Sequence, residues 1–286
     1  MTIRSADQFQ VYSLYLVTFA SSFGFITVMT LLPAYINLLN PSGALVGVFV
    51  SAIAIARAVA ILPLSWAGDR YDKRSLLLVS LAVSIGAYLL FAVITTSYGF
   101  IGARLLQGLG MVGTGLLGLA LVSELAPVDQ RANVIGKYNV WRMAAGIVGT
   151  LGAGALYELA GFEAVFGLLA VLLAVTLLAV GRFVDPDETT VEGFAFFDLA
   201  LNRRLITMTS FRAQYAVGVT LVRNWVPIYV GVSVARGGLA ASALVVGMVL
   251  AAEKFTNMLC QPWTGRLADR HGRAVFVIIG GTLYGL

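Results

Sequence analysis

The stretch GRLADRHGR, residues 265–273, holds three arginines, a histidine and an aspartate between two apolar runs. Much earlier the chain reads SWAGDRYDKR at 65–74, where the Asp-Arg pair at 69–70 matches the pair at 269–270. Each charged stretch follows a run that is long and apolar enough to cross a bilayer. A charged motif that occurs twice at such a distance predicts a chain built from two related halves.

Composition places the chain in a membrane. Of its 286 residues 59% are hydrophobic and 12% are charged, and the mean hydropathy is +0.89. A soluble domain carries about a quarter of its residues charged. The net charge of +5 is therefore taken as a topology signal and not as a sign of nucleic acid.

Cysteine and histidine usage excludes several kinds of chemistry. Cys260 and His271 are the only residues of their types. The chain therefore cannot form an intrachain disulfide, a metal site with several thiolates or a zinc site with two histidines. His271 lies in a charged stretch, which argues against a Ser-His-Asp triad inside the membrane. We expect no metal, no cofactor and no enzymatic activity.

Apolar runs of the length needed for a membrane helix, about 20 residues, occur eight times. They lie at 11–38, 43–64, 75–95, 97–121, 132–157, 162–183, 205–232 and 240–264. The sequence thus predicts an all-α integral membrane protein. A ninth run, 274–286, stops after 13 residues, so we expect a fragment that is truncated after eight complete helices.

Lysine and arginine set the orientation. With the N-terminus inside, the cytoplasmic segments hold Arg4, Arg70, Lys73, Arg74, Arg131, Lys137, Arg182, Arg203, Arg204, Arg266, Arg270 and Arg273. Only Arg236 is then outside, which agrees with the positive-inside rule. Short loops and the lack of an Asn-x-Ser/Thr acceptor favour a prokaryotic cytoplasmic membrane.

The repeat extends beyond the charged stretches. PAY at 33–35 matches PIY at 227–229, each near the outer end of its span. Six spans separate the two copies, so both enter the membrane in the same direction and form a parallel repeat. We expect an N-terminal six-helix half at 1–183, a cytoplasmic linker at 184–204, and an incomplete C-terminal half at 205–286 with helices 7, 8 and part of 9.

These motifs resemble the major facilitator superfamily along the whole chain. GRLADRHGR matches the loop signature of that family, and SWAGDRYDKR is a looser copy with Ser65 and Asp72 in place of its glycines. RLLQGLG at 104–110 and ELAPVDQR at 124–131 resemble its helix 4 motif and the loop that follows. The resemblance implies a bundle of two parallel six-helix repeats that works by alternating access.

The charged stretches predict a conformational latch, because an acid can bind a helix N-terminus and an arginine can pair with an acid at a neighbouring helix end. The alternative is that they only anchor topology. The latch candidates are Asp69, Arg70, Arg74, Glu124, Arg131, Asp269, Arg270 and Arg273.

Charges inside the spans are candidate functional residues, because each is costly in lipid unless it faces a partner or a wet cavity. Arg104 matches the helix 4 arginine of the family, for which the resemblance implies proton coupling, and Gln107 belongs to the same motif. Glu253 either titrates with the proton cycle or pairs with an arginine. Arg223 and Lys254 either face a cavity or snorkel.

The resemblance also indicates which residues line a substrate cavity. The candidates are Phe23, Thr27, Arg57, Met111, Arg142, Arg212 and Tyr215. Ordinary helix packing is the alternative for each. The glycines of GIVGTLGAG at 146–154 resemble the antiporter signature of the family without its proline, which favours export as much as it favours close helix packing.

We therefore expect a secondary transporter that exports a small molecule, driven by protons, as a monomer in the lipid bilayer and without nucleic acid. Two alternatives remain. One is uptake of an anionic metabolite, which the excess of interior cations would suit. The other is a membrane sensor or scaffold without transport, which would not need Arg57 or Arg104 at depth.

Overall fold

The computed structural model describes residues 5–187, 203–271, 279–280 and 282. Every regular element in these ranges is a helix. The elements are α1 Ser5–Leu39, α2 Gly43–Arg70, α3 Lys73–Ala92, α4 Ser97–Leu125, α5 Arg131–Phe183, α6 Arg203–Gly231, the 3-10 turn η1 Val234–Arg236, and α7 Ala243–His271.

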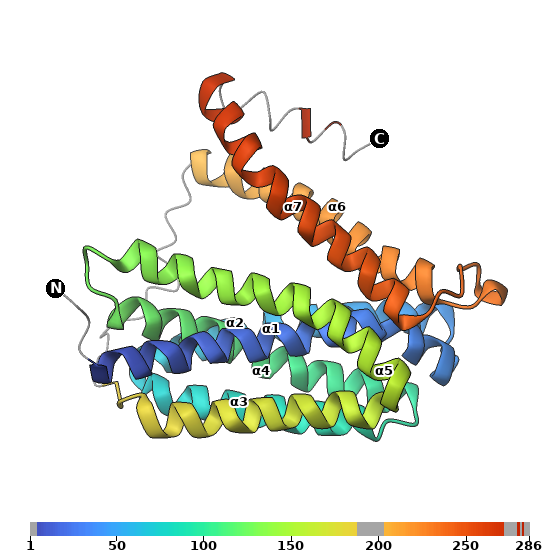
Figure 1. The fold of residues 1–286 in the computed structure, drawn as a ribbon, viewed down its shortest axis with the longest axis horizontal. Coiled ribbons are helices and arrows are strands. Elements are labelled where there is room, and N and C mark those ends of the chain that lie inside the picture. The colour runs from blue at the N-terminus through green and yellow to red at the C-terminus, as the bar shows by residue number, and fades with distance from the viewer. Residues whose placement is uncertain (1–4, 188–202, 272–278, 281, 283–286) are drawn as a thin grey trace.

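The predicted spans at 132–157 and 162–183 form one helical run of 53 residues, α5. Gly161 interrupts it with φ 74° and ψ −170°, a backbone conformation that residues with a Cβ avoid. The chain reverses there (Figure 1). Both arms pack on α1, while 131–160 also packs on α7 and 162–183 also packs on α3. One helical run therefore provides the two crossings that the sequence predicts.

Six helices of the described ranges are long and apolar enough to cross a membrane, with α5 counted once. Within the described residues α6 is not among these helices. The chain is thus a multi-pass membrane protein. The count of eight spans stays a prediction, and most of the ninth run lies outside the described residues.

The helices extend past the apolar runs at 43–64 and 240–264 and continue to Arg70 and His271. Both Asp-Arg pairs therefore lie in the last turn of a helix, and not in a loop as the sequence motif suggested. Cations favour the C-terminal turn of a helix, where the macrodipole is negative. Asp72, which replaces a signature glycine, caps α3 by accepting hydrogen bonds from the Arg74 and Ser75 amides.

The first five helices pack around a core of aromatic rings. Tyr35, Phe91, Phe100 and Phe166 are almost completely buried, and the Tyr35 hydroxyl donates to the Phe91 carbonyl at 2.5 Å. α1 packs against both arms of α5 and against α4 (Figure 1). We call this unit the α1–α5 bundle.

The α6–α7 pair touches the α1–α5 bundle at one end and diverges from it toward Arg203 and His271 (Figure 1). At the touching end Gly154 of α5 faces the start of α7, where a Cβ would meet the Ala243 carbonyl oxygen at 2.6 Å. We call this the closed end and the other the open end. The division into two halves with a linker at 184–204 stays a prediction, since 188–202 lies outside the described residues.

Candidate functional site

A cavity of about 550 Å³ lies between the α1–α5 bundle and the α6–α7 pair, and we call it the central cavity. Its charged lining comes from four helices. Arg57 lies on α2, Arg142 on α5, Arg223 on α6, and Glu253 and Lys254 on α7. Charge from both sides of the junction therefore faces one space.

A smaller cavity of about 230 Å³ adjoins the central one. The two share Ser22, Arg57, Met111 and Arg142. Because Arg57 and Arg142 border both, these two residues lie where the cavities meet.

Two of the three charged residues that α6 and α7 contribute to the cavity form an ion pair with each other. Arg223 Nη2 lies 3.0 Å from Glu253 Oε1, so the pairing alternative for Glu253 holds in this state. The Lys254 stem passes over Gly146, with Cδ 3.4 Å from where a Cβ would stand. Arg223 and Lys254 thus face the cavity.

The predicted cavity residues divide into three groups. Arg57, Met111 and Arg142 line the central cavity. Phe23 and Thr27 are buried on α1, which instead turns Ser22, Phe25 and Ile26 toward the cavity. Arg212 and Tyr215 are exposed on α6 and do not line it. Sequence spacing places these residues on a helix, but only packing decides which side faces the cavity.

Arg104 is completely buried inside the α1–α5 bundle. Its Nε donates to the Phe49 carbonyl at 3.2 Å, and Nη1 donates to Gln107 Oε1 at 2.9 Å. Nη2 contacts Met29 Sδ at 3.4 Å, and Gln107 Nε2 donates to the Tyr88 hydroxyl at 3.1 Å. The guanidinium therefore joins α1, α2 and α4, and through Gln107 it reaches α3.

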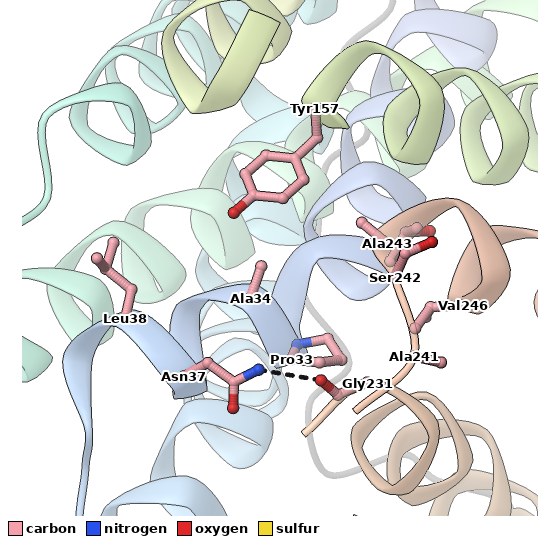
Figure 2. A pocket seen from close by; sticks show the side chains of 11 residues that line it. Pro33, Ala34, Asn37, Leu38, Tyr157, Gly231, Ala241, Ser242, Ala243 and Val246 are labelled. Atoms are coloured by element: carbon pink, nitrogen blue, oxygen red, sulfur yellow. Dashed lines mark hydrogen bonds between the residues drawn. The ribbon is translucent and has the colours of Figure 1, made fainter. Parts of the chain in front are cut away.

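The closed end is held by polar contacts that the sequence did not indicate. Asn37 Nδ2 donates to the Gly231 carbonyl at 3.0 Å, and Asn37 Oδ1 accepts from the Ser233 amide at 3.1 Å. A cavity of about 430 Å³ lies beside them, with Tyr157 above and Ser242 across from Asn37 (Figure 2). No motif marks these residues, because their partners are nearly 200 positions away.

Two further contacts strengthen the same end. Arg236 donates to the Pro41 carbonyl at 3.0 Å and also to Asn40 Oδ1. Glu158 Oε1 accepts from the Leu244 amide at 2.8 Å, at the first turn of α7, where backbone N–H groups have no helical partner. Among the described residues, the side chains of Asn37, Asn40, Glu158 and Arg236 thus join the bundle to the pair.

At the open end, Asp69, Arg70, Arg74 and Glu124, four of the latch candidates, lie next to other residues of the α1–α5 bundle. Arg70 lies over the Trp66 ring, and an Arg74 guanidinium N–H donates to the Gly181 carbonyl. Glu124 lies 3.1 Å from Lys73 Nζ, while Asp69 lines a shallow pocket next to Lys73. Lys73, which the sequence did not place in the latch, also pairs with Asp187 at 2.5 Å.

For the remaining latch candidates the structure shows no contact between the bundle and the α6–α7 pair within the described residues. Arg131 is exposed at the start of α5. Asp269 and Arg270 belong to the last turn of α7, but their side chains lie outside the described residues, as does the whole of Arg273. The latch therefore stays a prediction.

Asp72 holds the beginning of the linker. Its Oδ1 accepts from the Asp187 amide at 2.9 Å, and its Oδ2 accepts from the Ser75 hydroxyl at 2.5 Å. Burial raises the pKa of Asp72, but hydrogen bonds from Ser75, Asp187 and Arg74 outweigh it and bring the pKa below its usual value. This carboxylate is therefore a fixed negative group near neutral pH.

Comparison with known proteins agrees with the fold. The model of the Major Facilitator Superfamily matches residues 14–286. An uncharacterized MFS-type transporter of Mycobacterium tuberculosis, Rv1250, is 30% identical over 68% of this chain and 33% of its own length. The quinolone resistance protein NorA of Staphylococcus aureus is 23% identical over 80% of this chain and 63% of its own length.

Among solved structures, a bacterial homolog of the human lysosomal transporter Spinster, in an inward-facing and unoccupied conformation, matches with a TM-score of 0.65 at 16% identity. The match covers 96% of this chain and 64% of that one. The chain spans between about a third and two thirds of the relatives named here.

Proposed function

The chain belongs to the Major Facilitator Superfamily, and on that premise we propose that it moves a small molecule across the membrane by alternating access. One observation carries the proposal. A cavity lined from both sides of the junction lies between parts that meet at one end and diverge at the other. Such a site needs only a rocking motion to change the side to which it opens.

The orientation follows from positive charge. With the N-terminus inside, the open end faces the cytoplasm and this state is inward-open. The structural neighbour that is inward-facing and unoccupied supports this reading. In the opposite state the contacts of Asn37, Asn40, Glu158 and Arg236 would break and the latch at Asp69-Arg70 and Asp269-Arg270 would form.

Proton-driven export is the finer proposal. Glu253 is the only acid among the described residues that line the central cavity. Protonation would release Arg223, so proton binding and the charge of the site are linked. Arg104 remains charged at accessible pH and cannot itself carry the proton; with Gln107 it positions α4. The quinolone resistance protein among the relatives supports the export direction.

The function is tested by labelling both ends. In a Cys260→Ser background, a cysteine replaces Ala34 at the closed end or Leu119, which lines the pocket of Asp69 at the open end. Alternating access predicts that a proton gradient across proteoliposomes speeds labelling of one cysteine and slows the other. If the labelling rates of the two cysteines stay constant or rise together, the proposal is contradicted. A membrane sensor or scaffold without transport would then be the remaining function.

Direction is tested separately. Everted vesicles containing the protein should accumulate the quinolone norfloxacin when a proton gradient is applied, and a protonophore should abolish this. Uptake of an anionic metabolite is the second candidate function, favoured by the cavity cations, and would show the opposite direction of flux.

A further inference from the structure

The central cavity carries an excess of positive charge. Arg57, Arg142, Arg223 and Lys254 give four cations against one acid, Glu253, for a formal charge of +3. Glu253 already forms an ion pair with Arg223, with Oε1 3.0 Å from Nη2. Within the described ranges no carboxylate forms an ion pair with Arg57, Arg142 or Lys254.

Unpaired cations at membrane depth are costly, and each is stabilised only by water or by a counter-ion. Arg57 and Arg142 come from different helices and still face the point where the two cavities join. Two guanidinium groups facing one space favour a carboxylate or phosphate, which accepts paired N–H bonds.

Apart from the polar residues Ser22 and Asn257, the rest of the lining is mostly apolar and adaptable. Phe25 and Ile147 are joined by Met111, Met143 and Met258, and methionine side chains adjust to ligands of different shape. A cavity of about 550 Å³ is within the range of about 300–1,000 Å³ that holds a drug-sized molecule. The apolar lining therefore suits the body of an organic molecule and not a bare inorganic ion.

We propose that the cargo is a small organic anion with an apolar body, whose acidic group lies between Arg57 and Arg142. This rests on the proposed function, because it names the substrate class of the same cavity. On the α6–α7 side of the cavity, Glu253 neutralises Arg223. The acidic group of the cargo is therefore attracted to Arg57 on α2 and Arg142 on α5. A cationic molecule would meet three uncompensated like charges.

The test compares probes with one aromatic ring and different charge. Phthalate, benzoate, benzyl alcohol and benzylamine are added to the 286-residue chain in an uncharged detergent at neutral pH and low salt, and thermal unfolding is followed. Ligands that bind the folded state raise the unfolding temperature. We expect the largest rise with phthalate, a smaller one with benzoate, and none with benzyl alcohol or benzylamine.

Variants locate the site. Arg57→Gln and Arg142→Gln should each weaken phthalate binding by about tenfold or more, the value of a hydrogen bond to a charged group. Arg57→Lys and Arg142→Lys keep the charge but lose the paired N–H bonds, so each should bind phthalate more weakly than wild type and more tightly than the matching glutamine variant, which separates binding from folding. Glu253→Gln should bind phthalate several-fold more tightly. Lys137→Gln, which removes an exposed cation from α5 away from the cavity, should change nothing.

Stabilisation by benzylamine equal to that by phthalate would overturn the inference, and so would unchanged phthalate binding in both glutamine variants. Stabilisation by dihexanoyl-phosphatidylglycerol with none by phthalate or benzoate would assign the cations to lipid and also overturn it. Alternating labelling at Ala34 and Leu119 without phthalate binding would leave the transport function standing and remove only the anionic cargo.

Discussion

The Asn37 side chain of α1 donates to the Gly231 carbonyl at the end of α6 at 3.0 Å, across 194 positions of sequence (Figure 2). The same amide group accepts from the Ser233 amide at 3.1 Å. One side chain thus satisfies the carbonyl of the last residue of α6 and an amide two residues beyond it. Close packing of Gly231 against Pro33 accompanies these bonds.

Asn37→Ala should weaken the closed end, because both bonds are lost and each is worth about 0.5–1.5 kcal/mol. The labelling rate of a cysteine at Ala34 should rise severalfold in the Cys260→Ser background. Leu38→Ala, an exposed neighbour on the same helix, serves as control. Unchanged labelling in Asn37→Ala would show that these bonds do not hold the closed end.

Glu158→Gln tests the cap on α7. The glutamine oxygen can still accept from the Leu244 amide, but the negative charge at the positive helix end is lost, at a cost of about 0.3–1 kcal/mol. We expect faster labelling of a cysteine at Ala241 beside this turn. Glu163→Gln removes an exposed acid from the other arm of α5 and should have no effect. Equal rates in both variants would contradict a role for the carboxylate.

Gly108→Ala should destabilise the bundle, because the new Cβ would lie 2.6 Å from Ala56 Cβ and 2.9 Å from the Ile53 carbonyl oxygen. Overpacking of this kind costs about 1–3 kcal/mol. Gly102→Ala, on the same helix with open space around it, should be neutral or stabilising by up to about 1 kcal/mol. Thermal unfolding of the two variants side by side checks the difference, and equal stabilities would contradict a close α2–α4 approach.

Arg104→Lys should lower the unfolding temperature, since an ammonium group cannot reproduce the bonds to both Phe49 and Gln107. Hydrogen bonds to charged groups are worth about 1.5–3 kcal/mol. Arg182→Lys, at an exposed position, is the control. If Arg104 also positions α4 for transport, the pH dependence of cysteine labelling at both ends should shift as well. Normal stability together with a normal pH profile would show that Arg104 has neither a structural nor a positioning role.

Asp72→Asn should loosen the beginning of the linker at neutral pH. The folded-state pKa of Asp72 is below its usual value, so the contribution of the carboxylate is fully present above the unfolded pKa of about 4 and is lost as pH falls through the folded pKa. The difference in unfolding temperature between wild type and Asp72→Asn should therefore be constant near neutral pH and shrink below about pH 4. A difference that grows on acidification would contradict this sign.

Local pattern accounts for much of the fold. Apolar runs, glycine spacing and the repeated Asp-Arg stretches predict membrane helices and their order, because these depend on residues that are close in sequence. Ala145, Gly149 and Ala153 are spaced four residues apart along α5 and are all buried, with Gly149 against α1. Composition likewise places Arg57, Arg142 and Glu253 at membrane depth.

The sequence by itself determined that this chain is a helical membrane protein of a transporter family with charges inside its spans. Only the tertiary structure decided that Arg57, Arg142 and Lys254 share one cavity, that Glu253 pairs with Arg223, and that Arg104 is buried away from them. The physical reason is that helical periodicity restricts a residue to one side of its own helix. The rotation and tilt of each helix against the others, which set the partner, come from packing over the whole bundle.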